Sequence, residues 1–175
     1  MSNWMNNIEI EDGVIAYKDF SGRVDENNEN GEKTVTFAIS IDDGLKLIED
    51  GWYLRKQEFP NDPYREPRYL LKTCITFKTK DGRPKDPKVF MVREDGSMVH
   101  MTEDTIGLLD GADIIKVDAV IGPWRWRRNG KEGVKAYVNS MYITVKENRI
   151  DAKYRTMMNE MSNDEDLGHL PFPIE

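Results

Sequence analysis

The sequence predicts a mainly β protein built around a small closed antiparallel barrel, and three observations support this fold class. Apolar and polar residues alternate along several segments, as between Thr34 and Ile41, where every second side chain is apolar. Turn signals rich in Gly, Asn and Asp separate these segments. Only three segments have a helical pattern, and these are residues 42–50, 102–110 and 148–161.

The expected strands succeed one another through the first 146 residues. They are Ile8–Lys18, Thr34–Ile41, Tyr69–Thr79, Lys88–Arg93, Met98–Met101, Ile114–Ile121 and Gly133–Val145. Asn129-Gly130 is typical of a type I′ turn, so residues 122–137 should form a hairpin that joins the last two long strands. This order of elements favours an OB-fold, a five-stranded Greek-key barrel. A β-sandwich is the alternative, because a strand pattern does not decide whether a sheet closes.

Each predicted helix has recognisable ends. Residues 42–50 begin with two acidic side chains at the positive end of the helix dipole, and Gly51 follows. Residues 102–110 open with Thr102 as a cap and end before Gly111. Residues 148–161 carry a weak apolar stripe. After Met161 the composition changes to Asn, Asp, Gly and Pro, which is typical of a disordered segment.

A chain of 175 residues has the length of one globular domain with short additions. We expect three regions: an OB-fold nucleic-acid-binding domain over 1–146, a helical extension over 147–161, and a flexible acidic tail over 162–175. The combination is therefore a β barrel, one or two short helices, a C-terminal helix and a tail.

Composition argues against several classes of protein. Cys74 is the single cysteine, which excludes an internal disulfide and a Cys-rich zinc site. There is no Gly-rich phosphate loop and no His/Cys metal spacing, and the acidic pairs lie at turns and helix starts, where capping explains them. We therefore expect no catalytic residue, no metal and no cofactor. No apolar run reaches membrane-spanning length, and the N-terminus lacks the pattern of a signal peptide, which favours a soluble, cytoplasmic protein.

Charge is distributed unevenly along the chain. The net charge is −8 over residues 1–51, +5 over 52–146 and −4 over 147–175, which gives −7 in total. A basic middle inside an acidic total is compatible with a nucleic-acid-binding protein that carries an acidic appendage. Ordinary scatter of surface charge is the alternative interpretation.

The predicted hairpin carries the most informative residues. Trp124 and Trp126 share one face, and Arg125 and Arg127 share the other. Aromatic rings can stack on bases while cations track the phosphates of a single strand. The hairpin residues expected to contact single-stranded DNA are Trp124, Arg125, Trp126, Arg127, Arg128, Lys131, Lys135 and Tyr137. Alternatively, one tryptophan plugs the barrel end and the arginines are solvated.

A second basic and aromatic region lies between residues 52 and 88. Its candidate DNA contacts are Arg55, Lys56, Arg65, Arg68, Tyr69, Lys72, Phe77 and Lys78. Residues Pro60–Pro67 should form a mobile, extended loop that could fold over a strand. Trp52 and Cys74 are expected in the core rather than at a contact surface. A solvated strand and loop surface is the alternative interpretation of the charged residues.

The C-terminal tail combines acidic residues with a short apolar tip. An acidic and apolar peptide of this kind can dock on a partner protein or compete with DNA for a basic groove. The candidate docking residues are Asp164, Glu165, Asp166, Leu170 and Phe172. An ordinary frayed terminus is the alternative.

Several short stretches resemble a known family. They are Ile8-Glu9-Ile10, Phe20-Ser21-Gly22, the strand at 35–41, Asp50-Gly51-Trp52, Leu109-Asp110, Lys116-Val117-Asp118, Pro123-Trp124 and residues 129–137. Together they resemble the single-stranded DNA-binding proteins of bacteriophages and mobile elements, over residues 8–146. The resemblance implies an OB-fold that coats single-stranded DNA during replication or recombination, without catalysis.

The tail separately resembles the acidic tips of bacterial and phage single-stranded DNA-binding proteins, whose terminal Phe docks on replication partners. Here Phe172 is followed by three further residues, which departs from that pattern. Binding to RNA and self-association into a homo-oligomer stay open. So does a rival function, a phage-borne β barrel that inhibits or recruits a host protein through its acidic surface.

Overall fold

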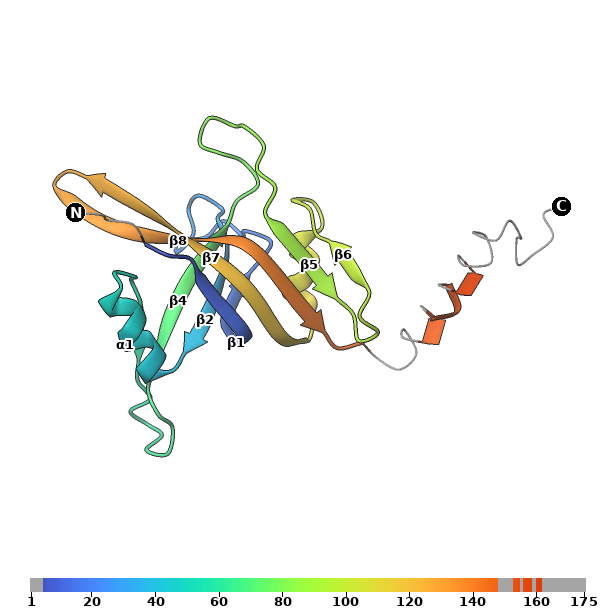
Figure 1. Ribbon diagram of the computed structural model, residues 1–175, viewed down its shortest axis with the longest axis horizontal. Coiled ribbons are helices and arrows are strands. Elements are labelled where there is room, and N and C mark those ends of the chain that lie inside the picture. Colours follow the sequence, from blue (N-terminus) through green and yellow to red (C-terminus); the bar gives the residue numbers. More distant parts are fainter. Residues whose placement is uncertain (1–4, 148–152, 155, 159, 162–175) are drawn as a thin grey trace. The chain divides into compact units, whose positions relative to one another are not determined.

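In the computed structural model, five long strands close into a barrel (Figure 1). Neighbouring strands follow the order β4-β2-β1-β7-β8, and β8 returns to β4 through the parallel pairs Thr73↔Ala136 and Cys74↔Tyr137. The strands are β1 (Ile8–Asp19), β2 (Lys33–Ile39), β4 (Arg68–Ile75), β7 (Ile114–Arg128) and β8 (Lys131–Val145). The predicted OB-fold-like closed barrel is confirmed, and the β-sandwich alternative is wrong.

The structure describes residues 5–147, 153, 154, 156–158, 160 and 161. The chain divides into two compact units, Met1–Val145 and Lys146–Glu175. The described residues of the second unit between 153 and 161 are helical, within the segment predicted as a helix. The tail expected over 162–175 lies outside the described residues. Within the described part of the chain, no helix is both long enough and apolar enough to span a membrane.

The barrel core is filled by alternate residues of each strand. Val35 and Phe37 of β2, Val117 and Ile121 of β7 and Ile143 of β8 are completely buried. Their sequence neighbours point outward, because successive side chains of a strand alternate between the two faces. The predicted alternation at 34–41 therefore identified one wall of the core correctly.

Helix α1 (Ile41–Glu49) follows β2 in the chain and packs against β4, close to its predicted bounds. The backbone N–H of Asp43 donates to Oγ of Ser40, which caps the helix at its N-terminus. Gly44 faces the ring of Tyr69 so closely that a Cβ atom there would collide with it. The glycine thus allows the helix to approach β4, and Trp52, just beyond the helix, is buried as predicted.

The helix predicted at 102–110 differs in type and extent. Residues 102–105 form a turn in which Thr102 O accepts hydrogen bonds from the N–H groups of Thr105 and Ile106. Only Ile106–Gly111 is helical, as the 3₁₀ helix η1. The carboxylate of Asp110, within η1, fixes the end of β1. It accepts hydrogen bonds from the N–H of Phe20 at 2.8 Å and from both the N–H and the Oγ of Ser21.

A side sheet extends the barrel wall beyond β8. Strand β5 (Lys88–Val92) pairs in parallel with β8, and β6 (Met98–His100) pairs with β5 at the sheet edge. The short strand β3 (Arg55–Gln57) on the other edge was not predicted. Its three polar residues have no apolar alternation, and pairing with β4 alone makes it a strand.

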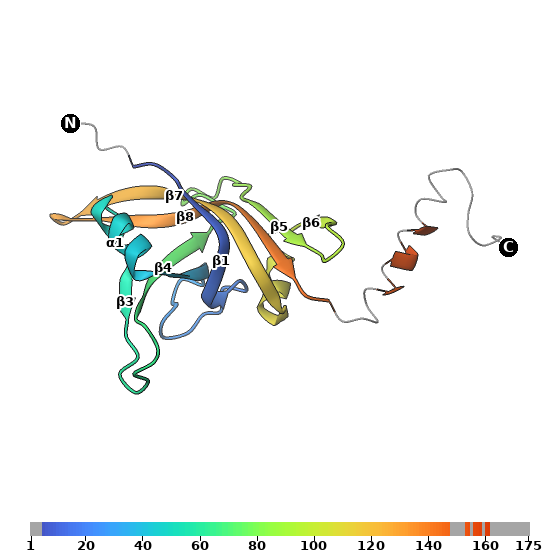
Figure 2. The same cartoon turned by 60° about the horizontal axis from the view of Figure 1, so that its bottom comes forward.

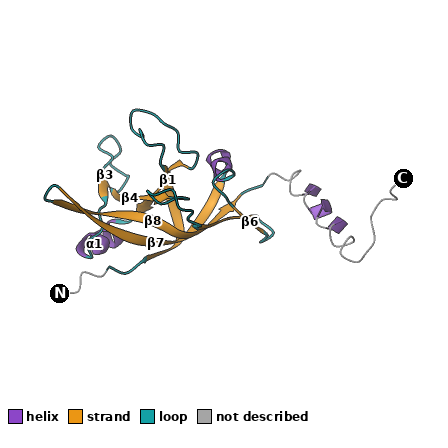
Figure 3. Ribbon diagram, turned by 90° about the horizontal axis from the view of Figure 1, so that it is seen from above, coloured by secondary structure: helices purple, strands orange, loops and turns teal. Residues whose placement is uncertain are grey.

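The β7–β8 hairpin reaches well beyond the barrel (Figure 3). Asn129 and Gly130 have φ values of 53° and 75°, as a type I′ turn requires, so the predicted hairpin is confirmed. Both strands are longer than expected, because the pairing continues without a break from Ile121↔Val138 to Arg128↔Lys131.

Two connections differ from expectation. Strand β4 ends at Ile75, before the predicted Thr79, and residues 76–87 form a loop that is closed by the bridge Lys78↔Pro84. Residues 58–67, which include the predicted Pro-rich loop, fold into turns and project away from the barrel (Figure 1, Figure 2). The guanidinium of Arg65 lies 3.6 Å from the centre of the Phe59 ring, so the loop packs on itself rather than lying extended over a strand.

Candidate nucleic-acid interface

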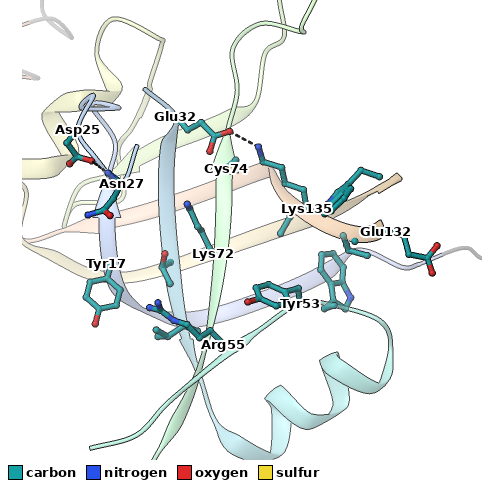
Figure 4. Close-up of a pocket in the computed structure, with 17 residues that line it drawn as sticks. Tyr17, Asp25, Asn27, Glu32, Tyr53, Arg55, Lys72, Cys74, Glu132 and Lys135 are labelled. Carbon is teal, nitrogen blue, oxygen red and sulfur yellow. Dashed lines mark hydrogen bonds and ion pairs between the residues drawn. The ribbon is translucent and has the colours of Figure 1, made fainter. Parts of the chain in front are cut away.

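A groove of about 1040 Å³ lies on the outer surface of the barrel, between loop 20–32 and the β7–β8 hairpin (Figure 4). In OB-folds this surface and the two loops beside it bind oligonucleotides. The residues that line the groove are Tyr17, Asp25, Asn27, Glu32, Thr36, Trp52, Tyr53, Arg55, Leu70, Lys72, Cys74, Trp126, Glu132, Gly133, Val134, Lys135 and Ala136.

Strand register explains how distant residues meet on this surface. Tyr17 of β1 pairs with Thr36 of β2, and Thr36 pairs with Lys72 of β4. Directly paired residues point to the same side of a sheet, so these side chains form one outward row. Figure 4 shows Lys72 in the middle of the groove, with Tyr17 and Tyr53 on different sides of it.

Loop 20–32 is held in shape by one amide side chain. Nδ2 of Asn28 donates to the backbone oxygens of Arg23 and Glu32, at 3.0 and 2.9 Å, and to Oδ2 of Asp19. Oδ1 of Asn28 accepts from the N–H of Glu32 at 2.9 Å. Because both backbone groups of Glu32 are fixed in this way, the wall that carries Asp25 and Glu32 is preformed.

The hairpin presents its tryptophans on the outer face. Trp126 lies across Gly133, where an added Cβ atom would come within 2.6 Å of the ring. Trp124 meets Tyr137 edge to face, with ring centres 6.5 Å apart. Trp124 and Trp126 remain 45% and 37% exposed. Exposed rings of this size are available to stack on bases.

Loop 76–87 brings cations to the same rings. The ammonium group of Lys80 lies 5.4 Å from the centre of the Trp124 ring, and that of Lys85 lies 5.1 Å from Tyr137. Lys135 approaches Tyr137 from the groove at 5.6 Å. The outer face of the hairpin therefore combines rings and positive charges within a few ångströms, the pairing that a single strand of nucleic acid needs.

An ion pair joins the two walls of the groove. Nζ of Lys135 donates to Oε1 of Glu32 at 2.6 Å, as the dashed line in Figure 4 shows. Partial burial disfavours the charged lysine and is the largest single influence on its pKa. The hydrogen bond and charge attraction to Glu32, together with the attraction of Cys74 and Tyr137, outweigh it and raise the pKa of Lys135 above its usual value. The lining residues comprise three acids and three bases, so Glu32 holds one of the few groove cations.

Two residues that line the groove are constrained by their surroundings. The hydroxyl oxygen of Tyr17 accepts a hydrogen bond from Gln57 at 2.8 Å, and Gln57 accepts one from Nε of Arg68 at 2.7 Å. This chain of bonds orients the Tyr17 ring. The free thiol of Cys74 is buried as predicted, but it lines the groove and is not part of the barrel core cluster. Burial raises its pKa, so the thiol stays protonated and unreactive.

The structure brings together only some of the residues predicted from the sequence. Arg55, Lys72, Trp126 and Lys135 line the groove, and Trp124 and Tyr137 adjoin it on the outer face of the hairpin. Arg125 and Arg127 alternate with the tryptophans and so lie on the other face. The guanidinium of Arg127 forms an ion pair at 3.4 Å with Glu132, which lines the groove. Arg128 and Lys131 flank the hairpin turn.

The other predicted residues lie elsewhere. Tyr69 and Phe77 pack against the core, and Tyr69 contacts helix α1. Lys56 pairs with Glu58, and Lys78 lies 4.0 Å from Glu103. Arg65 and Arg68 interact with the Phe59 ring, and neither lines the groove.

Sequence reasoning missed several lining residues. Tyr17 and Tyr53 are 50% and 74% exposed, and both lie in the groove. An aromatic residue on the polar side of an alternating strand is a signal that could have identified Tyr17. The acids Asp25, Glu32 and Glu132 gave no signal, because their importance depends on contacts made across the fold. Among the described residues, no cluster of three or more His, Cys, Asp or Glu side chains could hold a metal ion.

A comparison with families of known proteins assigns the chain to one of them. Residues 2–168 match the family described as "Putative phage ssDNA-binding domain". The chain belongs to this family. No curated protein matches the sequence.

Solved structures show a similar fold. The single-stranded DNA-binding protein from bacteriophage Enc34 in complex with ssDNA superposes with a TM-score of 0.52 at 14% identity, over 82% of this chain and 88% of that one. A C-terminal truncation of the same phage protein gives a TM-score of 0.50 at 13% identity, with the same coverage. At such low identity the likeness concerns the fold.

Proposed function

We propose that this protein binds single-stranded DNA in the groove between loop 20–32 and the β7–β8 hairpin, without catalysing a reaction. The observation that carries the proposal is the outward row of Tyr17, Thr36 and Lys72, with Lys135 across the β4–β8 pairing and the exposed rings of the hairpin beside it. The family to which the chain belongs supports the same ligand. Rings would stack on bases, and Arg55, Lys72 and Lys135 would contact phosphates.

Tryptophan fluorescence tests the proposal, since Trp124 and Trp126 are exposed beside the groove. Titration with poly-dT at several salt concentrations should quench the emission, and the affinity should fall as salt rises, because phosphate contacts release counterions. Lys72→Gln should weaken binding, whereas Lys46→Gln on helix α1 is a control that removes the same charge outside the groove. Absence of quenching at low salt would refute the proposal.

We further propose that the protein coats single strands during phage replication or recombination, and that the tail docks partner proteins. The tail residues Asp164, Glu165, Asp166, Leu170 and Phe172 lie outside the described residues, and their composition is the support. Deletion of 162–175 changes the net charge from −7 to −3. If the acidic tail competes with DNA for the groove, the truncated protein should bind single strands more tightly than the full chain at low salt. The difference in affinity should shrink as salt screens the charges. Competition between matched DNA and RNA oligomers measures the preference for the sugar.

A further inference from the structure

A second set of aromatic rings lies outside the groove, on the side sheet formed by β8, β5 and β6. The Phe90 ring stacks on Tyr142 with centres 5.4 Å apart and planes inclined by 10°. It also stacks on His100, at 5.0 Å and 28°. Strand register places Phe90 opposite both partners. We call these three side chains the ring row.

The ring row faces solvent rather than the core. Met141 and Ile143, on either side of Tyr142, and Val89, next to Phe90, are completely buried, so the ring-bearing residues point the other way. Tyr142 is 38% exposed, and the side chain of His100 is 39% exposed. Within the part of the chain that the structure describes, no other aromatic ring stacks on the outer side of either end ring. The row therefore offers π faces that the core does not use.

A carboxylate fixes the end of the ring row and places a cation beside it. Oδ1 of Asp86 lies 3.3 Å from Nε2 of His100, and its Oδ2 accepts a hydrogen bond from Nζ of Lys88 at 2.6 Å. The same carboxylate thus orients the ring on the edge strand and holds an ammonium group next to it. A ring with a neighbouring cation is the arrangement that binds a base together with its phosphate.

The ring row is continuous with the groove along strand β8. Tyr137 and Tyr142 are five residues apart on β8, or about 16 Å at the rise of an extended strand. Lys85 lies over the Tyr137 ring. Lys88 of β5 lies opposite Ser140 in the β5–β8 strand pairing, and Ser140 lies between the two tyrosines in β8. A strand of nucleic acid that leaves the groove past Tyr137 would thus meet two lysines before it reaches Tyr142.

We propose that the ring row is a second base-stacking site for the same single-stranded DNA, occupied by the nucleotides that leave the groove along β8. The inference rests on the proposed function of the groove and extends it to a longer binding path. Aromatic side chains on an open sheet face stack bases in other nucleic-acid-binding folds.

The test compares affinities for dT oligomers of about 6 to about 30 nucleotides, a range that brackets the site sizes of such barrels. His100→Ala and Tyr142→Ala should bind the shortest oligomers like the wild type and the longer ones about five-fold or more weakly, since each lost stack is a loss of this order. His100→Phe keeps a ring and should retain most of the affinity. Met98→Ala, an exposed residue on the same edge strand, is the control and should change nothing.

Other outcomes overturn the inference in distinguishable ways. If both alanine variants bind every length like the wild type, the ring row does not contact DNA. If they change only the mass measured by light scattering, a second copy of the chain covers the row instead. If the wild type binds no oligomer of any length, the proposed function of the groove fails, and the second site fails with it.

Discussion

Replacement of Glu32 by Gln should tighten the binding of single-stranded DNA. In the free protein, the Glu32 carboxylate forms an ion pair with the ammonium group of Lys135 at 2.6 Å. A phosphate that bound Lys135 would have to replace this carboxylate. Glutamine keeps the length of the side chain but removes its charge. Loop 20–32 should keep its shape, because Asn28 binds the backbone of Glu32 and not its side chain.

The size of the effect follows from the exposure of the pair. The side chains of Lys135 and Glu32 are 34% and 36% exposed, and partly solvated ion pairs contribute up to about 1 kcal/mol. If DNA must break this pair, its removal strengthens binding by up to about five-fold. Because Lys135 would then contact a phosphate in both proteins, the slope of log K against log salt should change little in Glu32→Gln, whereas Lys135→Gln should reduce it by about 0.7.

Fluorescence titrations with dT oligomers over a range of salt concentrations measure both quantities. Glu132→Gln is the matched control, because Glu132 also lines the groove but pairs with the well-exposed Arg127 at 3.4 Å. A salt slope that Lys135→Gln leaves unchanged would show that Lys135 contacts no phosphate. Weaker binding by Glu32→Gln would show that Glu32 supports the groove rather than competing with DNA.

Three further substitutions test other parts of the structure. Gly133→Ala should displace the Trp126 ring and weaken DNA binding several-fold with little change in melting temperature; unchanged Trp126 emission and affinity would contradict this. Asn28→Ala should release loop 20–32 and lower both stability and DNA affinity, which thermal melting and titration measure; a loop with unchanged amide exchange would contradict it. Asp110→Asn should cost about 1 kcal/mol of stability at neutral pH, because the carboxylate is partly exposed and its hydrogen bonds are screened. Burial opposes the charged form, but the hydrogen bonds from Ser21 and Phe20 lower the pKa of Asp110 below 3.8. The stability that Asp110 contributes is therefore present above pH 3.8 and is lost as the pH falls through the lowered pKa. Equal acid sensitivity of the wild type and Asp110→Asn would refute this assignment.

The strands of the barrel could be predicted from sequence because each one has a local pattern. Val35 and Phe37 alternate with polar residues, and Asn129-Gly130 specifies its own turn. Closure of the barrel could not be predicted in the same way. It depends on parallel pairing between β4 and β8, which are far apart in the chain, and no local pattern encodes that pairing.

The candidate site was predicted only in part, for a related reason. Trp126 and Lys135 were identified because rings and cations are concentrated in one hairpin. Tyr17 and Glu32 come from the strongly acidic N-terminal third, which regional charge alone marks as a poor partner for DNA. They reach the groove because β1, β2 and β4 lie side by side, so their role depends on register rather than on composition.

The parallel seam between β4 and β8 also affects how the protein folds and opens. Only Thr73↔Ala136 and Cys74↔Tyr137 join these strands, whereas β7 and β8 pair from Ile114↔Val145 to Arg128↔Lys131 with two register shifts. Contacts between distant segments form slowly, so the hairpin should form early and the seam should close late. The same seam is the part of the barrel wall where local opening breaks the fewest contacts. Since the groove lies over Cys74 and Ala136, a ligand held there bridges both sides of the seam and slows amide exchange at these residues.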